Sequence, residues 1–204
     1  MSIELIPLFP IVVLRKKFEG TFTKKQMIIL TKSKQRSNMS NKSSVDTYIL
    51  ESPELANLKE FCTVGLQDYF THVYSTPHNS STTPYITQSW LNWTDNNESH
   101  HKHMHPNSIL SGVFYISSLP EDAIQFVDNS KSKTFQFEEP TEWTVFNSGS
   151  WSVPAEELTL VIFPSYLQHL VDKRVGDKTR ISLSFNSFIK GTLGSEKSLT
   201  KLIL

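Results

Sequence analysis

The chain has 204 residues and a mass of 23.3 kDa, which is enough for one domain with a sizeable core. Its 20 Lys and Arg residues balance its 20 Asp and Glu residues, which excludes an overall basic field that would attract nucleic acid or an anionic membrane. The one cysteine, Cys62, excludes an intramolecular disulfide framework and a cysteine-based zinc ribbon.

The apolar runs of the sequence are too short for a membrane span. A typical run, residues 11–14 behind Pro10, is far below the roughly 20 residues that a bilayer requires. Arg15, Lys16 and Lys17 follow this run, whereas a secretory signal carries its positive charge first. We therefore expect a cytoplasmic protein without membrane or nucleic-acid partners.

The N-terminal part of the chain predicts two strands, a polar loop and one helix. Strands are expected over 11–14 and 27–30, on either side of a polar turn. Residues 31–47 are nearly all polar and predict a mobile surface loop, because they cannot bury much apolar area. A helix is expected over 52–74, since Ser52 can cap it, a proline follows, and its apolar residues recur at the helical period.

The remainder of the chain predicts short strands separated by turn residues, after a second loop over 76–84. The expected strands are 109–117, 123–127, 134–137, 144–146, 158–163, 167–171 and 180–188. Strands this closely spaced favour an antiparallel sandwich or barrel, because strands alternating with helices need longer connections. We expect a single domain over 1–204, with N-terminal strands and a support helix over 1–75 and a β core over 85–190.

The histidines are clustered and indicate a metal site. His100, His101, His103 and His105 lie close together, and the next histidine is His169. Residues i and i+2 of a strand project to the same face, so His103 and His105 can contact one ion, with His169 as the third ligand. Two alternatives remain open: His100 and His101 as solvated surface residues, and His169 as a hydrogen-bonded core residue.

The strand expected at 180–188 begins with a strict alternation. Ile181, Leu183 and Phe185 project to one side, and Arg180 projects to the other with small polar residues. Such a polar face is compatible with solvent. It also suits the interior of a barrel that binds a carboxylate, because a guanidinium makes paired, charge-assisted hydrogen bonds.

In this order, the histidine blocks and the later arginine resemble the Fe(II)/2-oxoglutarate-dependent oxygenases, and more narrowly a family of small 2-oxoglutarate oxygenases found in bacteria and marine phages. The resemblance is carried by His103-Met104-His105-Pro106-Asn107-Ser108, Phe163-Pro164-Ser165, His169 and Arg180-x-Ser182. It implies a mainly β protein with flanking helices, folded as a double-stranded β-helix, the cupin-like jelly-roll. It also implies an enzyme that uses Fe(II), 2-oxoglutarate and O2 to hydroxylate a C–H bond of a peptidyl or small-molecule substrate, releasing succinate and CO2, in the host cytoplasm if the gene is viral.

The resemblance implies roles for seven residues. The catalytic metal ligands would be His103, His105 and His169. The co-substrate 2-oxoglutarate would bind a further set of polar side chains, namely Arg180, Ser182, Tyr115 and Asn92. Tyr115 shares the parity of His103 and His105 if the chain between them is extended without a break, and a packing role in the sheet is the alternative reading of this tyrosine.

One residue departs from the usual pattern of the superfamily, which is two histidines and one carboxylate. Position 105 is a histidine where an acidic residue is expected. Three arrangements remain open. All three histidines bind the metal; or His103 and His169 bind alone, as in the aspartyl/asparaginyl β-hydroxylases; or His105 is the proximal ligand, with Asn107 two residues on.

Three further features could serve a binding site. Gly112 predicts a close approach of the co-substrate or of a neighbouring strand, or else a bulge. A set of aromatic residues could line the pocket or pack in the core or at its rim, namely Trp90, Trp93, Tyr85 and Trp151. The polar stretches 31–47 and 76–84 are candidate lids over a substrate, with plain surface loops as the alternative.

Two rival functions use the same fold. One is a cupin-like isomerase or sugar-binding protein with three histidines on Zn²⁺ or Mn²⁺, and the other is a non-catalytic structural jelly-roll. Arg180 favours the oxygenase, because an isomerase does not need a basic anchor after the distal histidine. The substrate stays open, and a homodimer is one open alternative for the oligomeric state.

Overall fold

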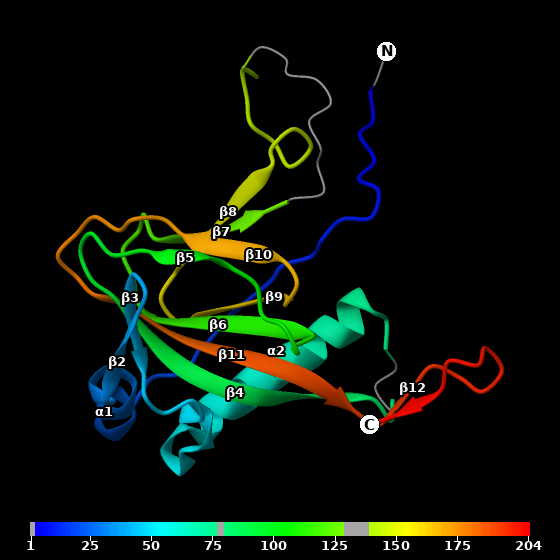
Figure 1. Cartoon of the computed structure of the whole chain (residues 1–204), viewed down its shortest axis with the longest axis horizontal. Helices are drawn as coiled ribbons and strands as arrows, with labels where there is room; N and C mark the ends of the chain where they lie inside the picture. The colour runs from blue at the N-terminus through cyan, green and yellow to red at the C-terminus, as the bar shows by residue number, and fades with distance from the viewer. Residues whose placement is uncertain (1–2, 77–79, 129–138) are drawn as a thin grey trace.

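The structure is a computed structural model that describes residues 3–76, 80–128 and 139–204. Two β-sheets lie one above the other, and the long helix α2 (Ala56–Val73) covers the opposite face of the larger sheet (Figure 1). Every ladder between the described strands is antiparallel, and this mainly β sandwich is the expected jelly-roll. No helix in the described residues is long and apolar enough to cross a bilayer.

The larger sheet has seven strands and the smaller has four. In spatial order, the large sheet contains β1 (Leu14–Lys17), β9 (Thr159–Pro164), β6 (Leu110–Ser117), β11 (Arg180–Lys190), β4 (Thr83–Thr94), β3 (Asn41–Ser44) and β2 (Gln35–Asn38). The small sheet contains β5 (His100–His103), β10 (Gln168–Val171), β7 (Ala123–Val127) and β8 (Ser150–Pro154). A separate C-terminal hairpin pairs β12 (Thr192–Leu193) with β13 (Leu202–Ile203).

The central strands β6 and β11 are buried on both faces, and alternate residues serve two different layers. Leu183 and Phe185 join the main hydrophobic core under α2. Arg180 and Ser182, one residue out of phase, face the small sheet instead and line a pocket there. The alternation expected from the sequence of this strand is therefore confirmed, and its polar face lies inside the sandwich.

The predicted helix at 52–74 is confirmed, whereas the strand predicted at 27–30 is wrong. After the short turns η1 (Ile49–Glu51) and η2 (Pro53–Leu55), α2 runs to Val73. Residues 24–32 form helix α1 (Lys24–Lys32), which begins with a capping box. Thr23 Oγ1 accepts from the Gln26 backbone N–H at 3.3 Å, and Gln26 Oε1 accepts from the Thr23 N–H at 2.8 Å. This pairing satisfies two free N–H groups and outweighs the apolar run.

The prediction of a mobile surface loop, and thus of a lid, over 31–47 is also wrong. Its residues form the β2–β3 hairpin, which continues the large sheet because β3 pairs with β4. Ser44 is fully buried, and its Oγ accepts from the Leu91 backbone N–H at 3.0 Å. Small hydroxyl side chains can therefore build a buried strand when the main chain supplies their hydrogen-bond partners.

Most of the predicted strands are confirmed. The matching pairs are 109–117 with β6, 123–127 with β7, 158–163 with β9, 167–171 with β10 and 180–188 with β11. The strand predicted at 144–146 is wrong, because Phe146 N donates to Thr144 Oγ1 in a turn, and 134–137 lies outside the described residues. The first strand begins at Leu14 instead of residue 11, and the sequence analysis missed β4 and β8.

Gly112 shows how tightly β6 and β11 pack. It lies opposite Phe185 in the ladder, and a Cβ added at Gly112 would lie 2.1 Å from Cζ of that ring. Of the alternatives open for Gly112, close approach of the neighbouring strand is therefore the one realised. The Phe185 ring is fully buried, and protein interiors are close-packed with few voids.

We predict that Gly112→Ala lowers the free energy of unfolding by about 1–3 kcal/mol, because overpacking forces buried side chains off their preferred positions. Denaturant unfolding monitored by tryptophan fluorescence measures the change. Gly149→Ala is the matched control, since a Cβ there meets no described atom within 4 Å. Equal stability of the two variants would contradict the prediction.

Candidate metal centre and co-substrate pocket

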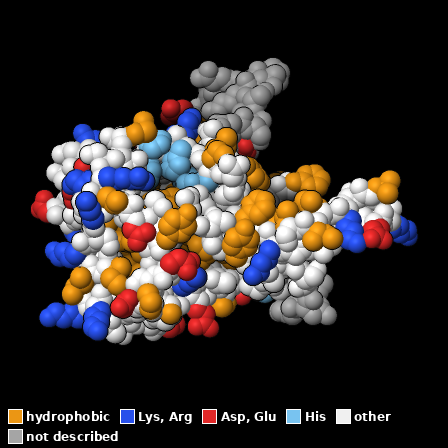
Figure 2. All heavy atoms as spheres, turned by 60° about the horizontal axis from the view of Figure 1, so that its bottom comes forward, with side chains coloured by type: hydrophobic (Ala, Val, Ile, Leu, Met, Phe, Trp, Pro, Cys, Tyr) orange, Lys and Arg blue, Asp and Glu red, His pale blue; other side chains and the backbone are white. Residues whose placement is uncertain are grey.

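A polar pocket lies between the two sheets. Figure 2 shows that histidine side chains gather in one patch that reaches the surface. The polar lining comes from β4, β5, β6, β10 and β11 and from the segment after β5. It consists of Asn92, His100, His103, His105, Ser111, Tyr115, His169, Arg180, Ser182 and Ser184. All seven residues singled out from the sequence therefore line this one pocket.

His103, His105 and His169 converge on one point. His103 on β5 and His169 on β10 are direct partners in the antiparallel ladder, and their ring centroids lie 4.3 Å apart. The His105 ring lies 4.9 Å from the His103 ring and 5.1 Å from the His169 ring. One ring nitrogen from each residue lies within 4.8 Å of the other two, which is close enough to hold one ion.

The predicted cause of this convergence, that His103 and His105 share one strand, is wrong. His103 and His105 do not lie on one strand, because β5 ends at His103. The His105 backbone N–H donates instead to the carbonyl of Ser165 at 2.9 Å. The chain then turns at Asn107, where φ is 60°. Asn107 does not line the pocket, so the arrangement that used it as a partner of His105 gains no support.

Backbone carbonyls fix the orientation of two of these rings. The Nδ1 of His103 lies 2.7 Å from the carbonyl oxygen of His101, and the Nδ1 of His169 lies 3.0 Å from that of Leu167. A carbonyl only accepts, so both rings carry their proton on Nδ1 and leave the Nε2 lone pair free. Metal-bound histidines in proteins show the same arrangement, with the second ring N–H donating to a carbonyl or carboxylate.

His100 has the opposite tautomer. The Nδ2 of Asn38 donates to the Oδ1 of Asn41 at 2.8 Å, so the other end of the Asn41 amide is its NH2 group. The Nδ2 of Asn41 lies 3.3 Å from His100 Nδ1. The His100 Nδ1 therefore accepts this hydrogen bond, and the proton of the neutral ring is on Nε2. Although the His100 ring stacks on His103 with centroids 4.7 Å apart, it offers the pocket an N–H donor and no lone pair.

Burial keeps these rings uncharged. Removal from water lowers the pKa of His169 to about 3, of His105 to about 4 and of His100 to about 3, and it also lowers the pKa of His103. The neighbouring imidazoles add to the effect in each case. At neutral pH the rings are neutral, so no proton competes with a metal for the free lone pairs.

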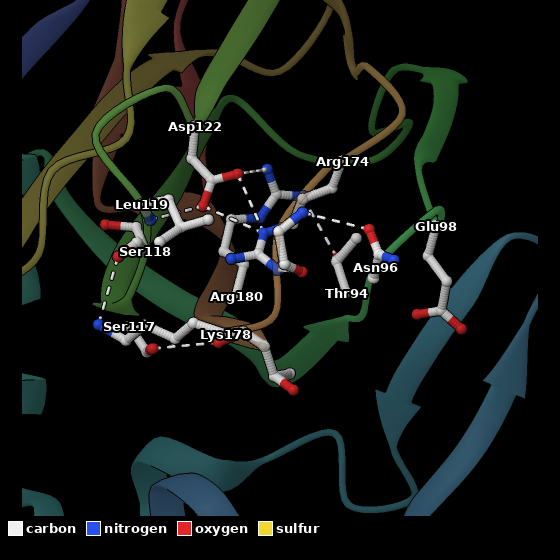
Figure 3. Close-up of polar contacts among 12 residues, drawn as sticks. Thr94, Asn96, Glu98, Ser117, Ser118, Leu119, Asp122, Arg174, Lys178 and Arg180 are labelled. Carbon is white, nitrogen blue, oxygen red and sulfur yellow. Dashed lines mark hydrogen bonds and ion pairs between the residues drawn. The ribbon is translucent and has the colours of Figure 1, made fainter.

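Arg180 supplies a buried positive charge to the pocket (Figure 3). Its side chain is 4% exposed, and its Nη2 donates to Thr94 Oγ1 at 3.3 Å. Its Nη1 has no hydrogen-bond partner among the described residues and lies 3.8 Å from the Asp122 carboxylate. Burial lowers the pKa of the guanidinium from its high normal value, and an arginine stays charged in such a site. A carboxylate in the pocket would supply the missing acceptor.

Tyr115 and Asn92 complete the polar face beside Arg180. Burial raises the pKa of Tyr115 to about 12, so its hydroxyl is a neutral group that can donate a hydrogen bond. Asn92 Nδ2 donates to Ser184 Oγ at 3.0 Å, and its Oδ1 has no partner among the described residues. Ser182 lies between Arg180 and Ser184 on the same face of β11.

Residues 88–186 are similar to a known protein family. This segment, which holds the histidines and Arg180, matches the model of a protein family described as "Putative 2OG-Fe(II) oxygenase". Over these residues the chain matches the 2OG-Fe(II) oxygenase family. It is accordingly an enzyme of the Fe(II)- and 2-oxoglutarate-dependent oxygenase class. A search of the curated proteins found no match.

Solved structures of oxygenases share the fold. HygX from Streptomyces hygroscopicus, solved with nickel, 2-oxoglutarate and hygromycin B, is 12% identical with a TM-score of 0.57, over 87% of this chain and 82% of HygX. The carbocyclase SnoK from nogalamycin biosynthesis is 11% identical with a TM-score of 0.57, over 86% and 78%. An oxidoreductase of the 2OG-Fe(II) oxygenase family from Burkholderia pseudomallei is 11% identical with a TM-score of 0.54, over 86% and 83%. At such low identity these likenesses establish the jelly-roll architecture alone.

The residues of the pocket fit both Fe(II) and 2-oxoglutarate, the two groups that the family name contains. Neutral imidazoles with free lone pairs are suitable ligands for Fe(II), and the unpartnered Nη1 of Arg180 is suitable for a carboxylate. Among the described residues, no aspartate or glutamate joins His103, His105 and His169 within ligand distance. Within the described residues, no acidic side chain from another segment therefore takes the place of the carboxylate that position 105 lacks.

Sequence reasoning missed two parts of this oxygenase site. Asp122 and Arg174 lie directly behind Arg180 and are almost fully buried, although both come from segments that read as surface turns. The donor role of His100 was missed as well, since it depends on Asn41 in the hairpin that was expected to be a loop. A buried charge in a turn has no local sequence signal, because its partner is remote in the chain.

We predict that, in the metal-free oxygenase at neutral pH, His103 and His169 are protonated on Nδ1 and His100 on Nε2. Long-range ¹H–¹⁵N correlation spectra distinguish the tautomers by the chemical shifts of the two ring nitrogens. Asn41→Ala should release His100 into tautomer exchange and leave His169 unchanged, because Asn41 hydrogen-bonds His100, whereas the His169 ring is held by the carbonyl of Leu167. A lone pair on Nδ1 of His103 would contradict the assignment.

Proposed function

We propose that the protein hydroxylates a C–H bond of a peptidyl or small-molecule substrate, using Fe(II), 2-oxoglutarate and O2 and releasing succinate and CO2. One observation carries the proposal. Three neutral imidazoles within 4.8 Å of one another share a pocket with an arginine whose Nη1 lacks a partner. A metal site together with a basic anchor is what a bidentate keto acid with a second carboxylate requires.

In this proposal the metal is held by His103, His105 and His169. Two of these rings are oriented by backbone carbonyls two residues earlier in the chain, and the third residue is held through its backbone by Ser165. When bound, Fe(II) supplies the oxidative chemistry that side chains cannot perform. The protein contributes a preformed face of nitrogen donors on one side and leaves the pocket side open to co-substrate and substrate.

The distal carboxylate of 2-oxoglutarate is assigned to Arg180, with Ser182, Tyr115 and Asn92 around it. The guanidinium would neutralise the carboxylate, and the two hydroxyl groups would donate to its oxygens. Asn92 would act as a spacer, since its Nδ2 already donates to Ser184. These groups would hold the co-substrate in one orientation, so that its keto-acid end faces the histidines.

We also propose that the whole chain acts as one domain, with the N-terminal strands and support helix over 1–75 serving the jelly-roll core over 85–190. The pairing of β1 with β9 and of β3 with β4 supports this organisation, because segments from both parts share one sheet. Helix α2 supports it too, since Leu58 and Leu66 pack in the same core as Leu183.

We predict that anaerobic Fe(II) and 2-oxoglutarate together produce a visible charge-transfer absorption band that neither produces alone. The band requires a keto acid bound to iron through both of its donor groups. Arg180→Gln should still bind Fe(II) and should need a much higher 2-oxoglutarate concentration for the same band. Bound Fe(II) without a band in the wild-type protein would contradict the proposed function.

We predict that His105→Ala lowers the affinity for Fe(II) roughly tenfold or more, since even residues that only support metal ligands typically contribute this much. Anaerobic competition with a chromophoric chelator measures the affinity. His100→Ala is the matched control, because His100 lies in the same cluster but presents an N–H. Equal affinities of the two variants would leave His103 and His169 as the only histidine ligands.

A further inference from the structure

Two buried arginines share one buried carboxylate behind the pocket (Figure 3). Arg174 Nε donates to Asp122 Oδ1 at 3.2 Å and to Oδ2 at 3.3 Å. Asp122 Oδ2 also accepts from the Leu119 backbone N–H at 2.8 Å. The distance of 3.8 Å from Arg180 Nη1 to Asp122 Oδ1 is too long for a hydrogen bond. Asp122 is therefore committed to Arg174 and only loosely attracts Arg180.

This cluster of Arg174, Asp122 and Arg180 carries an excess of one positive charge. All three side chains are at most 6% exposed. Both Arg174 Nη2 and Arg180 Nη1 lack a hydrogen-bond partner among the described residues. A buried charge without a counter-ion destabilises the folded protein, and this protein keeps one in the cluster. An anion that enters the pocket would relieve it at Arg180, the one member of the cluster that lines the pocket.

Arg174 does not line the pocket and is held from behind by the main chain. The backbone N–H of Arg174 donates to the backbone carbonyl of Glu98 at 2.8 Å, and the backbone carbonyl of Arg174 accepts from the Asn97 N–H at 2.8 Å. The next loop residues are tied to the same turn, since Gly176 N–H donates to Asn96 Oδ1 at 3.1 Å. Arg174 is thus fixed where it can reach Asp122 but cannot touch a ligand in the pocket.

We propose that Arg174 is a positioning residue for the co-substrate: it occupies Asp122 and so keeps the Arg180 guanidinium available for the distal carboxylate of 2-oxoglutarate. The inference rests on the proposed function and adds to it the group that sets the affinity of the anchor. Without Arg174, Asp122 would pair with Arg180 alone, and the incoming carboxylate would have to compete with an internal one.

The proposal predicts the effects of charge changes by their sign. The formal charge of the cluster is +1 in the wild type, 0 in Arg174→Gln, +2 in Asp122→Asn and again +1 in the double variant. Arg174→Gln should weaken 2-oxoglutarate binding about tenfold, the lower end expected for loss of one charge-assisted interaction. The double variant should recover most of that loss, and Asp122→Asn should bind at least as tightly as the wild type.

Calorimetric titration of the Co(II)-loaded protein with 2-oxoglutarate, and separately with pyruvate, tests this without turnover. Pyruvate has the keto-acid end but lacks the distal carboxylate, so the ratio of the two affinities isolates the anchor. Arg174→Gln should reduce this ratio, whereas its pyruvate and Co(II) affinities should stay unchanged. Arg36→Gln, a change of the same chemistry on exposed β2, is the matched control and should leave the ratio unaltered.

The outcomes separate the inference from the proposed function. A wild-type protein that binds 2-oxoglutarate no better than pyruvate would overturn the assignment of Arg180. A normal wild-type ratio with no recovery in the double variant, or with a lowered ratio in Asp122→Asn, would overturn the role of Arg174. Arg174→Lys keeps the cluster charge and should keep the ratio, which provides a test even if Arg174→Gln does not fold.

Discussion

The structure depends on one constraint: both faces of the central strands β6 and β11 are enclosed, one by the core under α2 and the other by the pocket between the sheets. Each second residue must fill the core under α2, and each intervening residue must face the pocket between the sheets. Leu183 and Phe185 satisfy the first requirement, while Arg180 and Ser182 satisfy the second. A slip of one residue in the register would place an arginine in the apolar core. The ladder that stabilises the fold therefore also positions the polar groups of the site.

The same enclosure sets the electrostatics of the site. In water a histidine is partly protonated near neutral pH, but burial between two sheets keeps the rings around His103 and His169 neutral. The same low polarity makes the excess charge of the cluster around Arg180 unfavourable until an anion arrives. The pocket is neutral at the histidines and positive at Arg180, and this difference between its ends suits an elongated dianion such as 2-oxoglutarate.

Strict alternation and strong turn signals made most of the β core predictable from sequence, as in β6, β7 and β11. The errors arose where polar residues were assumed to be exposed. The segment 31–47 was read as a loop because its side chains are hydrophilic, yet Ser44 is buried with its hydroxyl bonded to a backbone N–H. The helix at 24–32 was missed because its apolar run also suits a strand, although the capping pair Thr23 and Gln26 was visible.

The residues that line the pocket were predictable from the sequence, whereas the residues behind them were not. The seven residues named from the sequence all line the pocket, since motif order and spacing along the strands carry that information. The groups behind them were not predictable, because Asp122 and Arg174 meet only through the folding of two separate turns. The residues that line the pocket thus carry a motif, whereas the charged residues behind them are brought together only by tertiary structure.

The preset histidine rings also bear on how the protein obtains its iron. A donor set whose orientation is fixed by its own backbone does not rearrange to favour one ion over another. Imidazole nitrogens also bind zinc, copper and nickel, and the general order of affinities places Fe(II) below those three. As the proposed ligands, His103 and His169 would therefore accept several divalent metals. The metal bound would then depend on the relative supply of free ions and on the co-substrate.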